Sequence, residues 1–320
     1  MKNKSELTDF YYKSLYPILK KLDEQRKQVQ YRVILIISLF SFIYGFILYS
    51  ILNATNFQID FLIGGGVAYV AIVGFIYKFL IQDYTEEFKD SIIKPLITAI
   101  EPQLNYSAHM HIPQLHFNRS ELFTHPDKIN GNDFVKGVID SIPLQFSDIH
   151  AQKRYKDSKG RESWSTVFKG LFIVAEFNKH FHSKTIILPD TAQSMFGDFI
   201  GGWLQSNNFS QESLVKMDNS EFEKEFVVYA SDQVEARYIL SHTLMEKLLH
   251  LKKRSKHPVY FSFVGEQIYI AIYYDKDLFE PTVFKSLLEY KVAMEYVDTL
   301  HMAIGIIQEL KLNQKLWSKQ

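Results

Sequence analysis

The chain of 320 residues contains no cysteine, which excludes disulfide bonds, thiolate metal sites and cysteine nucleophiles. It has no excess of either charge, because Lys plus Arg and Asp plus Glu both number 36. A neutral chain has no overall basic field that attracts nucleic acid, so we expect no nucleic-acid partner. Nucleophile-elbow, phosphate-loop and zinc-protease motifs are also missing. The sequence therefore names no catalytic residue, and we expect neither a metal nor a cofactor.

Charge is also missing from two long apolar runs near the N-terminus. The first run, Val33 to Leu52, holds no charged residue, and the second, Phe61 to Ile81, holds only Lys78 close to its end. An apolar helix of roughly 20 residues spans a hydrocarbon core of roughly 30 Å. A pair of buried core helices or a cleaved signal peptide fits these lengths poorly. The runs predict a two-helix transmembrane hairpin over residues 33–81, with the lipid bilayer as partner.

Basic residues around the hairpin predict its orientation. The loop between the spans, Asn53 to Asp60, contains neither Lys nor Arg, and its Asn53-Ala54-Thr55 sequon lies too close to the membrane to indicate a glycan. Lys and Arg are retained on the cytoplasmic side, so we expect both termini in the cytoplasm. The basic residues outside the loop are Lys2, Lys4, Lys13, Lys20, Lys21, Arg26, Lys27, Arg32, Lys78, Lys89 and Lys94.

Helical patterns flank the hairpin on both sides. Residues 1–32 form a predicted cytoplasmic tail, in which Ser5 to Tyr31 shows helical apolar spacing and Pro17 either begins a second helix or kinks the first. We interpret this tail as continuous with the first span rather than as a helix lying on lipid. Residues 82–134 are predicted to form an amphipathic helix from Tyr84 to about Tyr106 and a connector. The glycines of the second span, Gly64, Gly65, Gly66 and Gly74, should let the first helix approach closely.

The connector carries the one histidine pattern that resembles a metal site. His109 and His111 are separated by one residue, and His116 follows. Two such histidines on one strand face can bind a metal, but no third ligand is spaced to complete the site. We interpret them as histidines of a linker.

Residues 135–320 are predicted to form a cytoplasmic α+β domain with a mostly antiparallel sheet. A charged connector, Lys153 to Ser163, is predicted to be an exposed hairpin loop rather than a surface that binds lipid or nucleic acid. Gly265-Glu266 is predicted to form a tight hairpin turn. We also expect Glu280-Pro281 to open a final helical region, with a long C-terminal helix from Tyr290 to Leu312 that ends near Trp317. The predicted strands are 137–152, 165–178, 184–189, 222–229, 259–264 and 267–274.

One helix start supplies the candidate ligand-binding residues, Asp232, Gln233, Glu235 and Arg237. Asp232 is placed to cap a helix, and Glu235, three residues later, to reach back and close a capping box. Arg237 is expected to pair with one of the two carboxylates across a helical turn. The nearby Gly201-Gly202-Trp203 is no phosphate loop, because it lacks the Lys and the strand-loop-helix frame.

Three stretches carry a resemblance that covers nearly the whole chain, hairpin included. They are FKGLFIVAEFNKHFHSKTIILPD (Phe168 to Asp190), FEKEFVVYASDQVEARYIL (Phe222 to Leu240) and SFVGEQIYIAI (Ser262 to Ile272), with Glu280-Pro281 and Lys315-Leu-Trp317 beside them. They resemble an uncharacterised bacterial family of two-span membrane proteins, defined by domain of unknown function 3137. The resemblance implies a multi-pass protein of the bacterial cytoplasmic (inner) membrane and carries no catalytic residue or ligand. His182 stands where this pattern leads us to expect glycine, which argues against a required turn there.

Three functions remain open at this point. The first is a membrane-anchored cytoplasmic interaction or ligand-sensing module, with a protein partner or a second copy of the chain. The second is a membrane-surface enzyme with a hydrolase-like acid–base site, in which folding brings His180, His182, Glu176 or Asp190 near Asp232, Glu235 and Arg237. The third is an oligomerising scaffold with an exposed apolar helix face. We favour the module, because capping already accounts for Asp232 and Glu235.

Overall fold

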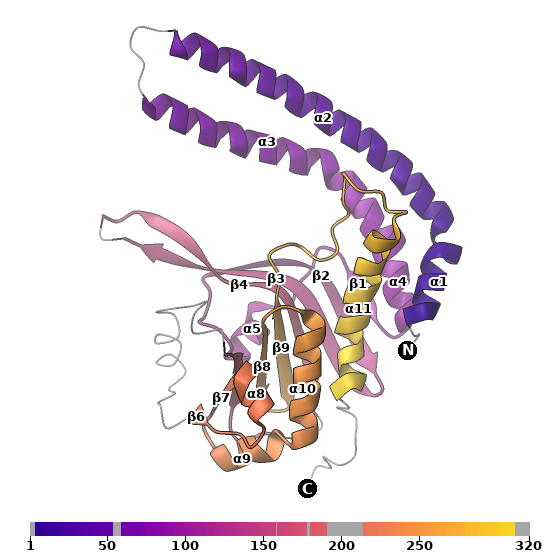
Figure 1. The fold of residues 1–320 in the computed structure, drawn as a ribbon, viewed down its shortest axis with the longest axis vertical. Helices are drawn as coiled ribbons and strands as arrows, with labels where there is room; N and C mark the ends of the chain where they lie inside the picture. The colour runs from indigo at the N-terminus through magenta and orange to yellow at the C-terminus, as the bar shows by residue number, and fades with distance from the viewer. Residues whose placement is uncertain (1–3, 54–58, 158, 178–179, 191–213, 311–320) are drawn as a thin grey trace. The chain divides into compact units, whose positions relative to one another are not determined.

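The computed structural model describes residues 4–53, 59–157, 159–177, 180–190 and 214–310 (Figure 1). The sequon's Thr55, Gly201-Gly202-Trp203 and Lys315-Leu-Trp317 lie outside these residues. The chain divides into two compact units. One is built from Asn3–Leu96 and Phe279–Val297, and the other from Ile97–Leu278 and the chain from Asp298 onwards.

The helical unit begins with α1 (Lys4–Ser14) and α2 (Tyr16–Leu52). Pro17 occupies the first turn of α2, where its missing N–H costs nothing, so it begins a second helix rather than kinking the first. Helix α2 then runs unbroken for 37 residues, which confirms that the tail helix continues into the first apolar run. Leu15, Leu19 and Leu22 are buried at the foot of this helix, whereas the apolar side chains beyond Val33 are largely exposed.

The second apolar run lies in α3 (Ile59–Phe88), which continues through a π-helical turn, η1 (Lys89–Ile93), into α4 (Lys94–Ile100). Pro95 has no N–H and cannot continue the α-helical hydrogen bonds, and the wider turn before it absorbs this break. The apolar side chains of this amphipathic segment, from Phe88 to Ile100, are buried. The predicted end near Tyr106 is wrong, because a turn follows Ile100 and Tyr106 belongs to a strand, β1 (Asn105–Ser107).

Helices α2 and α3 are both long and apolar enough to cross a membrane by length and composition, and none of their most apolar windows is buried. They run side by side in Figure 1. Tyr44 of α2 lies 3.7 Å from where a Cβ would stand on Gly65 or Gly66, so these two glycines face the first helix as expected. Gly64 and Gly74 face open space instead. Tyr44 also stacks on Tyr69 of α3, with ring centroids 4.5 Å apart.

The other unit is an α+β fold around one antiparallel sheet of nine strands, in the order β1-β2-β3-β4-β9-β8-β5-β7-β6. The strands after β1 are β2 (Lys128–Ile139), β3 (Ile142–Lys156), β4 (Glu162–Glu176), β5 (Thr185–Pro189), β6 (Leu214–Val215), β7 (Phe226–Ala230), β8 (Val259–Val264) and β9 (Gln267–Tyr273). The predicted antiparallel α+β class is therefore confirmed.

Both broad faces of the sheet are buried. On one face, a cluster that includes Phe168, Phe172 and Tyr260 packs against Phe117 of α5 (Gln114–Arg119). On the other face, neighbouring strands place Phe146, Ile173 and Ile270 in register, and all three are fully buried. Asp148, which lies on the same face as Phe146, is consequently hidden from water.

Two hairpins follow the predicted pattern closely. Strands β8 and β9 are joined by Gly265-Glu266, and Gly265 has the positive φ of 64° that a tight two-residue turn requires. Strands β3 and β4 enclose the charged connector, and the described residues from Arg154 to Trp164 are all exposed. The connector is thus an exposed hairpin, as expected, although both strands extend further into it than the pattern suggested.

The segment around Phe222 corrects the sequence interpretation. Phe222 and Lys224 were expected in a strand, but Ser220–Glu225 is a short helix, α8, and the strand β7 begins only at Phe226. Asn219 explains the helix, because its side chain accepts hydrogen bonds from the backbone N–H groups of Glu221 and Phe222.

The helices at the end of the chain also differ from expectation. After α9 (Gln233–Ile239), α10 (His242–Ser255) buries Leu244, Leu248 and Leu251, and it lies in front of the sheet in Figure 1. Residues 280–289 form turns and bends instead of opening a helical region. The C-terminal helix α11 (Tyr290–Leu310) begins at the expected residue, but with 21 residues it is short beside α2 and α3. Its expected continuation to Leu312 and Trp317 lies outside the described residues.

Candidate functional sites

The start of α9 holds the four candidate residues, and Asp232 caps this helix. Its Oδ1 accepts hydrogen bonds from the backbone N–H groups of Val234 and Glu235, at 2.8 and 3.1 Å. Gln233 accepts a long 3.4 Å hydrogen bond from the exposed Arg237 guanidinium. The expected pairing of Arg237 with a carboxylate is therefore replaced by a bond to a neutral amide.

Glu235 does not close a capping box. Its Oε1 accepts from the backbone N–H of His182, and its Oε2 accepts from the backbone N–H and the hydroxyl of Ser183, at 2.7 and 2.6 Å. The carboxylate therefore fastens α9 to the turn before β5. The capping box fails because these three donors from a distant segment compete successfully for both oxygens.

This arrangement brings together part of the predicted acid–base set. The rings of His180 and His182 lie 5.2 Å apart, and His180 Nδ1 is 3.6 Å from the carboxylate of Glu266. Asp190 follows the opposite end of β5, where its N–H donates to the carbonyl of Glu225, so it does not join them. The result is a cluster of the half-buried Glu235 with the exposed His180 and His182.

The chemistry of Glu235 suits a structural role. Burial raises the pKa of its carboxyl, but the hydrogen bonds from Ser183 and His182 and the charge of the His182 ring outweigh that effect, so the pKa lies below its usual value. A carboxylate that is ionised and already accepts three hydrogen bonds is a poor general base. The cluster therefore supports binding or structural order rather than proton transfer.

A groove of about 470 Å³ runs along one end of the sheet. Polar groups on its walls include His116, Lys136, Glu176 and Glu266. His116 Nδ1 is buried and finds no hydrogen-bond partner among the described residues. Burial, and then the charge of Arg119, lower the pKa of His116, so its ring is neutral at physiological pH. The groove has the size and mixed polarity of a small-ligand site.

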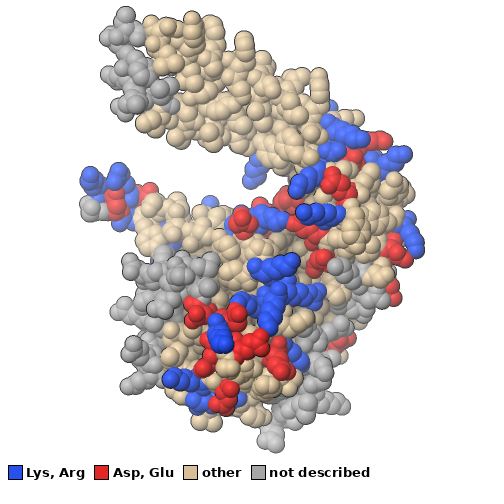
Figure 2. Space-filling model, viewed as in Figure 1, with Lys and Arg blue, Asp and Glu red and all other residues tan. Residues whose placement is uncertain are grey.

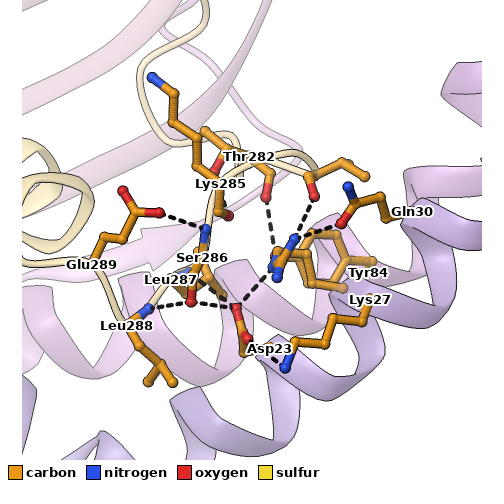
Figure 3. A network of polar contacts seen from close by, with 12 residues as sticks. Asp23, Lys27, Gln30, Tyr84, Thr282, Lys285, Ser286, Leu287, Leu288 and Glu289 are labelled. Carbon is orange, nitrogen blue, oxygen red and sulfur yellow. Dashed lines mark hydrogen bonds and ion pairs between the residues drawn. The ribbon is translucent and has the colours of Figure 1, made fainter.

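The helical unit contains a buried ion pair that lies at the foot of α2. Arg26 Nε is 2.8 Å from Asp23 Oδ1, and the two side chains are only 7% and 6% exposed. The same Asp23 oxygen accepts hydrogen bonds from the Ser286 hydroxyl at 2.7 Å and the Leu287 N–H at 3.3 Å. Figure 3 shows Asp23 and Gln30 pointing from α2 toward the segment that carries Ser286 and Leu287. Asp23 thus binds a segment more than 260 positions away in the chain.

Arg26 extends this network. Its Nη1 donates to Gln30 Oε1 at 2.9 Å and to the carbonyl of Val283 at 2.8 Å. Burial raises the pKa of Asp23, but hydrogen bonds from Arg26 and Ser286 and the charge of Arg26 hold it below its usual value. The pair is therefore ionised at neutral pH, and it is hydrogen-bonded both to Gln30 of α2 and to one returning segment.

The rest of that segment is also bound to the helices of this unit. Lys89 of η1 lies 2.8 Å from the carboxylate of Glu280, and the Tyr11 hydroxyl donates to the carbonyl of Leu287 at 3.0 Å. The Tyr84 hydroxyl lies 3.5 Å from the carbonyl of Thr282. We call Phe279–Leu288, with the side chains that bind it, the clasp.

A third buried polar group lies inside the sheet. Asp148 of β3 is 3% exposed, and its Oδ2 accepts a hydrogen bond from the Leu278 N–H at 3.0 Å. Its Oδ1 finds no partner among the residues that the structure describes. Burial, and less strongly the charges of Asp277 and Asp133, raise the pKa of Asp148 to about 7, against the opposing effects of the Leu278 bond and Lys169. The group is buried rather than open to a substrate.

Sequence reasoning missed Asp23, Arg26 and Asp148. A signal was present for each, because all three stand where an apolar residue belongs: Asp23 and Arg26 on the stripe that begins with Leu15, Leu19 and Leu22, and Asp148 two residues after the buried Phe146. A charged residue on a buried stripe indicates a buried partner. The partner itself could not be named from the pattern. Within the described residues, no group of three His, Asp or Glu is placed to hold a metal.

Comparisons with known proteins find a family model that matches part of the chain. Residues 166–312 match the model of the family described as "Protein of unknown function (DUF3137)". No curated protein matches the chain. Among solved structures, the crystal structure of the mycobacterial trehalose monomycolate transport factor A, TtfA, is similar at 7% sequence identity and a TM-score of 0.34, over 69% of this chain and 93% of that one. This likeness is too distant to carry an argument.

Proposed function

We propose that this chain, which carries a domain of the DUF3137 family over residues 166–312, is a membrane-anchored interaction or ligand-sensing module. Its apolar helices cross the bacterial cytoplasmic membrane, and its α+β unit and both termini lie in the cytoplasm. It binds a protein partner, a second copy or a small ligand, and it performs no chemistry of its own.

The observation that carries the proposal is the exposed apolar surface of α2 and α3. Phe46 and Phe75 are 67% and 74% exposed, as are many of their apolar neighbours. Figure 2 shows the two helices almost without charged side chains, whereas charged side chains of both signs gather at the helix ends away from the connecting loop. Contiguous apolar surface of this extent is stable in lipid and unfavourable in water.

The arrangement of polar groups supports binding rather than catalysis. The Glu235 carboxylate already accepts three hydrogen bonds, and Asp232 is engaged as a cap. The groove beside His116 is also lined by Lys136 and Glu176, which suits a small ligand with both donors and acceptors.

The absence of cysteine gives a direct test of the anchor. Single cysteines at Thr55, in the connecting loop, and at Ser5 and Ser220 would be labelled with a membrane-impermeant maleimide on intact spheroplasts. We expect Thr55→Cys to react at once and Ser5→Cys and Ser220→Cys to react only after lysis. Equal labelling of all three before lysis, or release of the protein by alkaline carbonate, would contradict the anchor and its orientation.

A second experiment tests the interaction. The full-length protein would be isolated from membranes in mild detergent, beside an Arg237→Ala copy of unchanged stability. A stoichiometric partner that is lost in the variant would support an interaction at the start of α9. A preparation that contains neither a partner nor a bound small molecule would oppose the module in this form.

A further inference from the structure

We propose that the turn of the clasp, Thr282–Lys285, is a lipid-contacting surface, and that Phe284 inserts into the interfacial layer of the same bilayer that the hairpin crosses. This inference rests on the membrane anchor proposed above. It concerns one compact unit, because the clasp and both apolar helices belong to the same part of the chain.

The first argument is depth. The Val283 carbonyl is bonded to the Arg26 guanidinium, which also holds Gln30, and Gln30 precedes the first span at Val33 by three residues. At about 1.5 Å per residue, Gln30 lies roughly 5 Å from the start of the span, and the guanidinium bonded to its side chain lies near this level. The headgroup layer on each side of a bilayer is roughly 5 to 7 Å thick. The Val283 carbonyl therefore lies within the headgroup layer.

The second helix gives the same depth independently. The Tyr84 hydroxyl lies near the Thr282 carbonyl, and Tyr84 follows the end of the second span, Ile81, by three residues. The turn is thus fixed from both α2 and α3, at the level where the first apolar run begins and the second ends. Figure 3 shows Thr282 and Tyr84 on the two sides of this contact.

The third argument is what the turn exposes. Phe284 is 58% exposed although its neighbour Val283 is buried, and Lys285 is exposed beside it. An aromatic ring beside a lysine suits the membrane interface, where the ring enters the acyl boundary and the ammonium group meets phosphate. Tyr31, two residues before Val33, is 68% exposed at the same level. A protein partner would not account for the placement of the turn at this depth.

The test uses the full-length chain and its lack of native cysteine. A nitroxide would be attached to the cysteine of a Phe284→Cys protein or of a Lys285→Cys protein, the second of which keeps Phe284. Both proteins would be placed in vesicles of phosphatidylcholine and phosphatidylglycerol at 3:1. Collision rates with oxygen, which concentrates in lipid, and with a water-soluble nickel chelate would be measured by electron paramagnetic resonance. Phe46→Cys, within the first span, and Ser14→Cys, at the end of α1, are the lipid and water references.

We expect the label at residue 284 to collide several-fold more often with oxygen than with the nickel chelate, as at residue 46 and unlike residue 14. Adding Arg26→Met should reverse this ratio, because the Val283 carbonyl loses its donor. A water-like ratio at 284 beside a lipid-like ratio at 46 would overturn the inference and leave the anchor intact. Protection of the label from both reagents would show that protein covers the turn, and this result would also overturn the inference. A water-like ratio at 46 would overturn the anchor itself.

Discussion

At the scale of single residues, this protein places charge where its sequence pattern calls for apolar side chains. Asp23 and Arg26 are buried together and satisfied by backbone groups of a distant segment. A buried ion pair contributes little net stability, but removal of one partner leaves an uncompensated charge away from water. The pair therefore determines where the returning segment binds more than how stable the unit is.

Replacement of Arg26 by methionine should lower the free energy of unfolding by about 3–5 kcal/mol, because Asp23 would remain buried without its partner. Lys27→Met is the matched control: Lys27 is 66% exposed and lies 3.7 Å from the other Asp23 oxygen, so about 0–1 kcal/mol is expected. Urea unfolding in detergent micelles, followed by circular dichroism, measures both. Equal effects of the two substitutions would show that the buried position of Arg26 has no special importance.

Asp148 should make stability depend on pH. Its pKa is raised to about 7, whereas an unfolded aspartate titrates near 3.9, so between these values the folded state binds the additional proton. The free energy of unfolding therefore falls as pH rises from about 4 to 7, by up to roughly 4 kcal/mol, and levels off above that range. Asp148→Asn should remove this decline. The free energy of unfolding of the variant, relative to that of the natural chain, should therefore increase between pH 5 and pH 8. Asp218→Asn, at an exposed position, should keep the decline.

At the scale of elements, α9 shows how one side chain joins two segments. Glu235 links the helix to the turn at His182 and Ser183 through three hydrogen bonds, which orders the residues that lead into β5. Hydrogen bonds to a charged group are worth about 1.5–3 kcal/mol. This link explains why two exposed histidines lie next to α9.

Glu235→Ala should therefore destabilise the α+β unit by roughly 2–4 kcal/mol, since the two backbone N–H groups of His182 and Ser183 lose their acceptor. Amide hydrogen exchange at these two residues should accelerate in the same variant. Arg237→Ala, on the exposed side of the same helix, should change stability by about 0.5 kcal/mol or less. Unchanged exchange at Ser183 would contradict the role given to Glu235.

At the scale of the whole molecule, the chain returns to its first unit after completing the sheet. Phe279–Val297 supplies Val283, Leu287 and Val292 to the interior of the helical unit, and Thr8 and Tyr11 of α1 bind to this segment. The apolar spans need no such support, because a helix satisfies its own backbone hydrogen bonds in lipid. Insertion and folding of the helical unit should therefore be separable.

A chain that ends at Leu278 should still resist extraction by alkaline carbonate but should be cut rapidly by trypsin at Lys20, Lys21 and Arg26. The reason is that the foot of α2 loses the segment that buries it. Mass spectrometry of membranes after limited digestion measures this, with a chain that ends at Leu310 as the protected control. Equal protection of the two chains would show that α1 and α2 fold without the clasp.

The sequence by itself determined the features that depend on local pattern. Run length and the absence of charge defined α2 and α3, short runs of β-branched and aromatic residues defined β8 and β9, and the need for a positive φ placed Gly265 in their turn. Only the tertiary structure decided how the polar groups are used. Asp23, Arg26 and Glu235 bind segments 52 to 264 positions away, and Phe222 lies in a helix because Asn219 caps it. Periodicity reports which face of an element is buried, whereas the identity of a distant donor or acceptor depends on how the chain returns, and no local pattern contains that information.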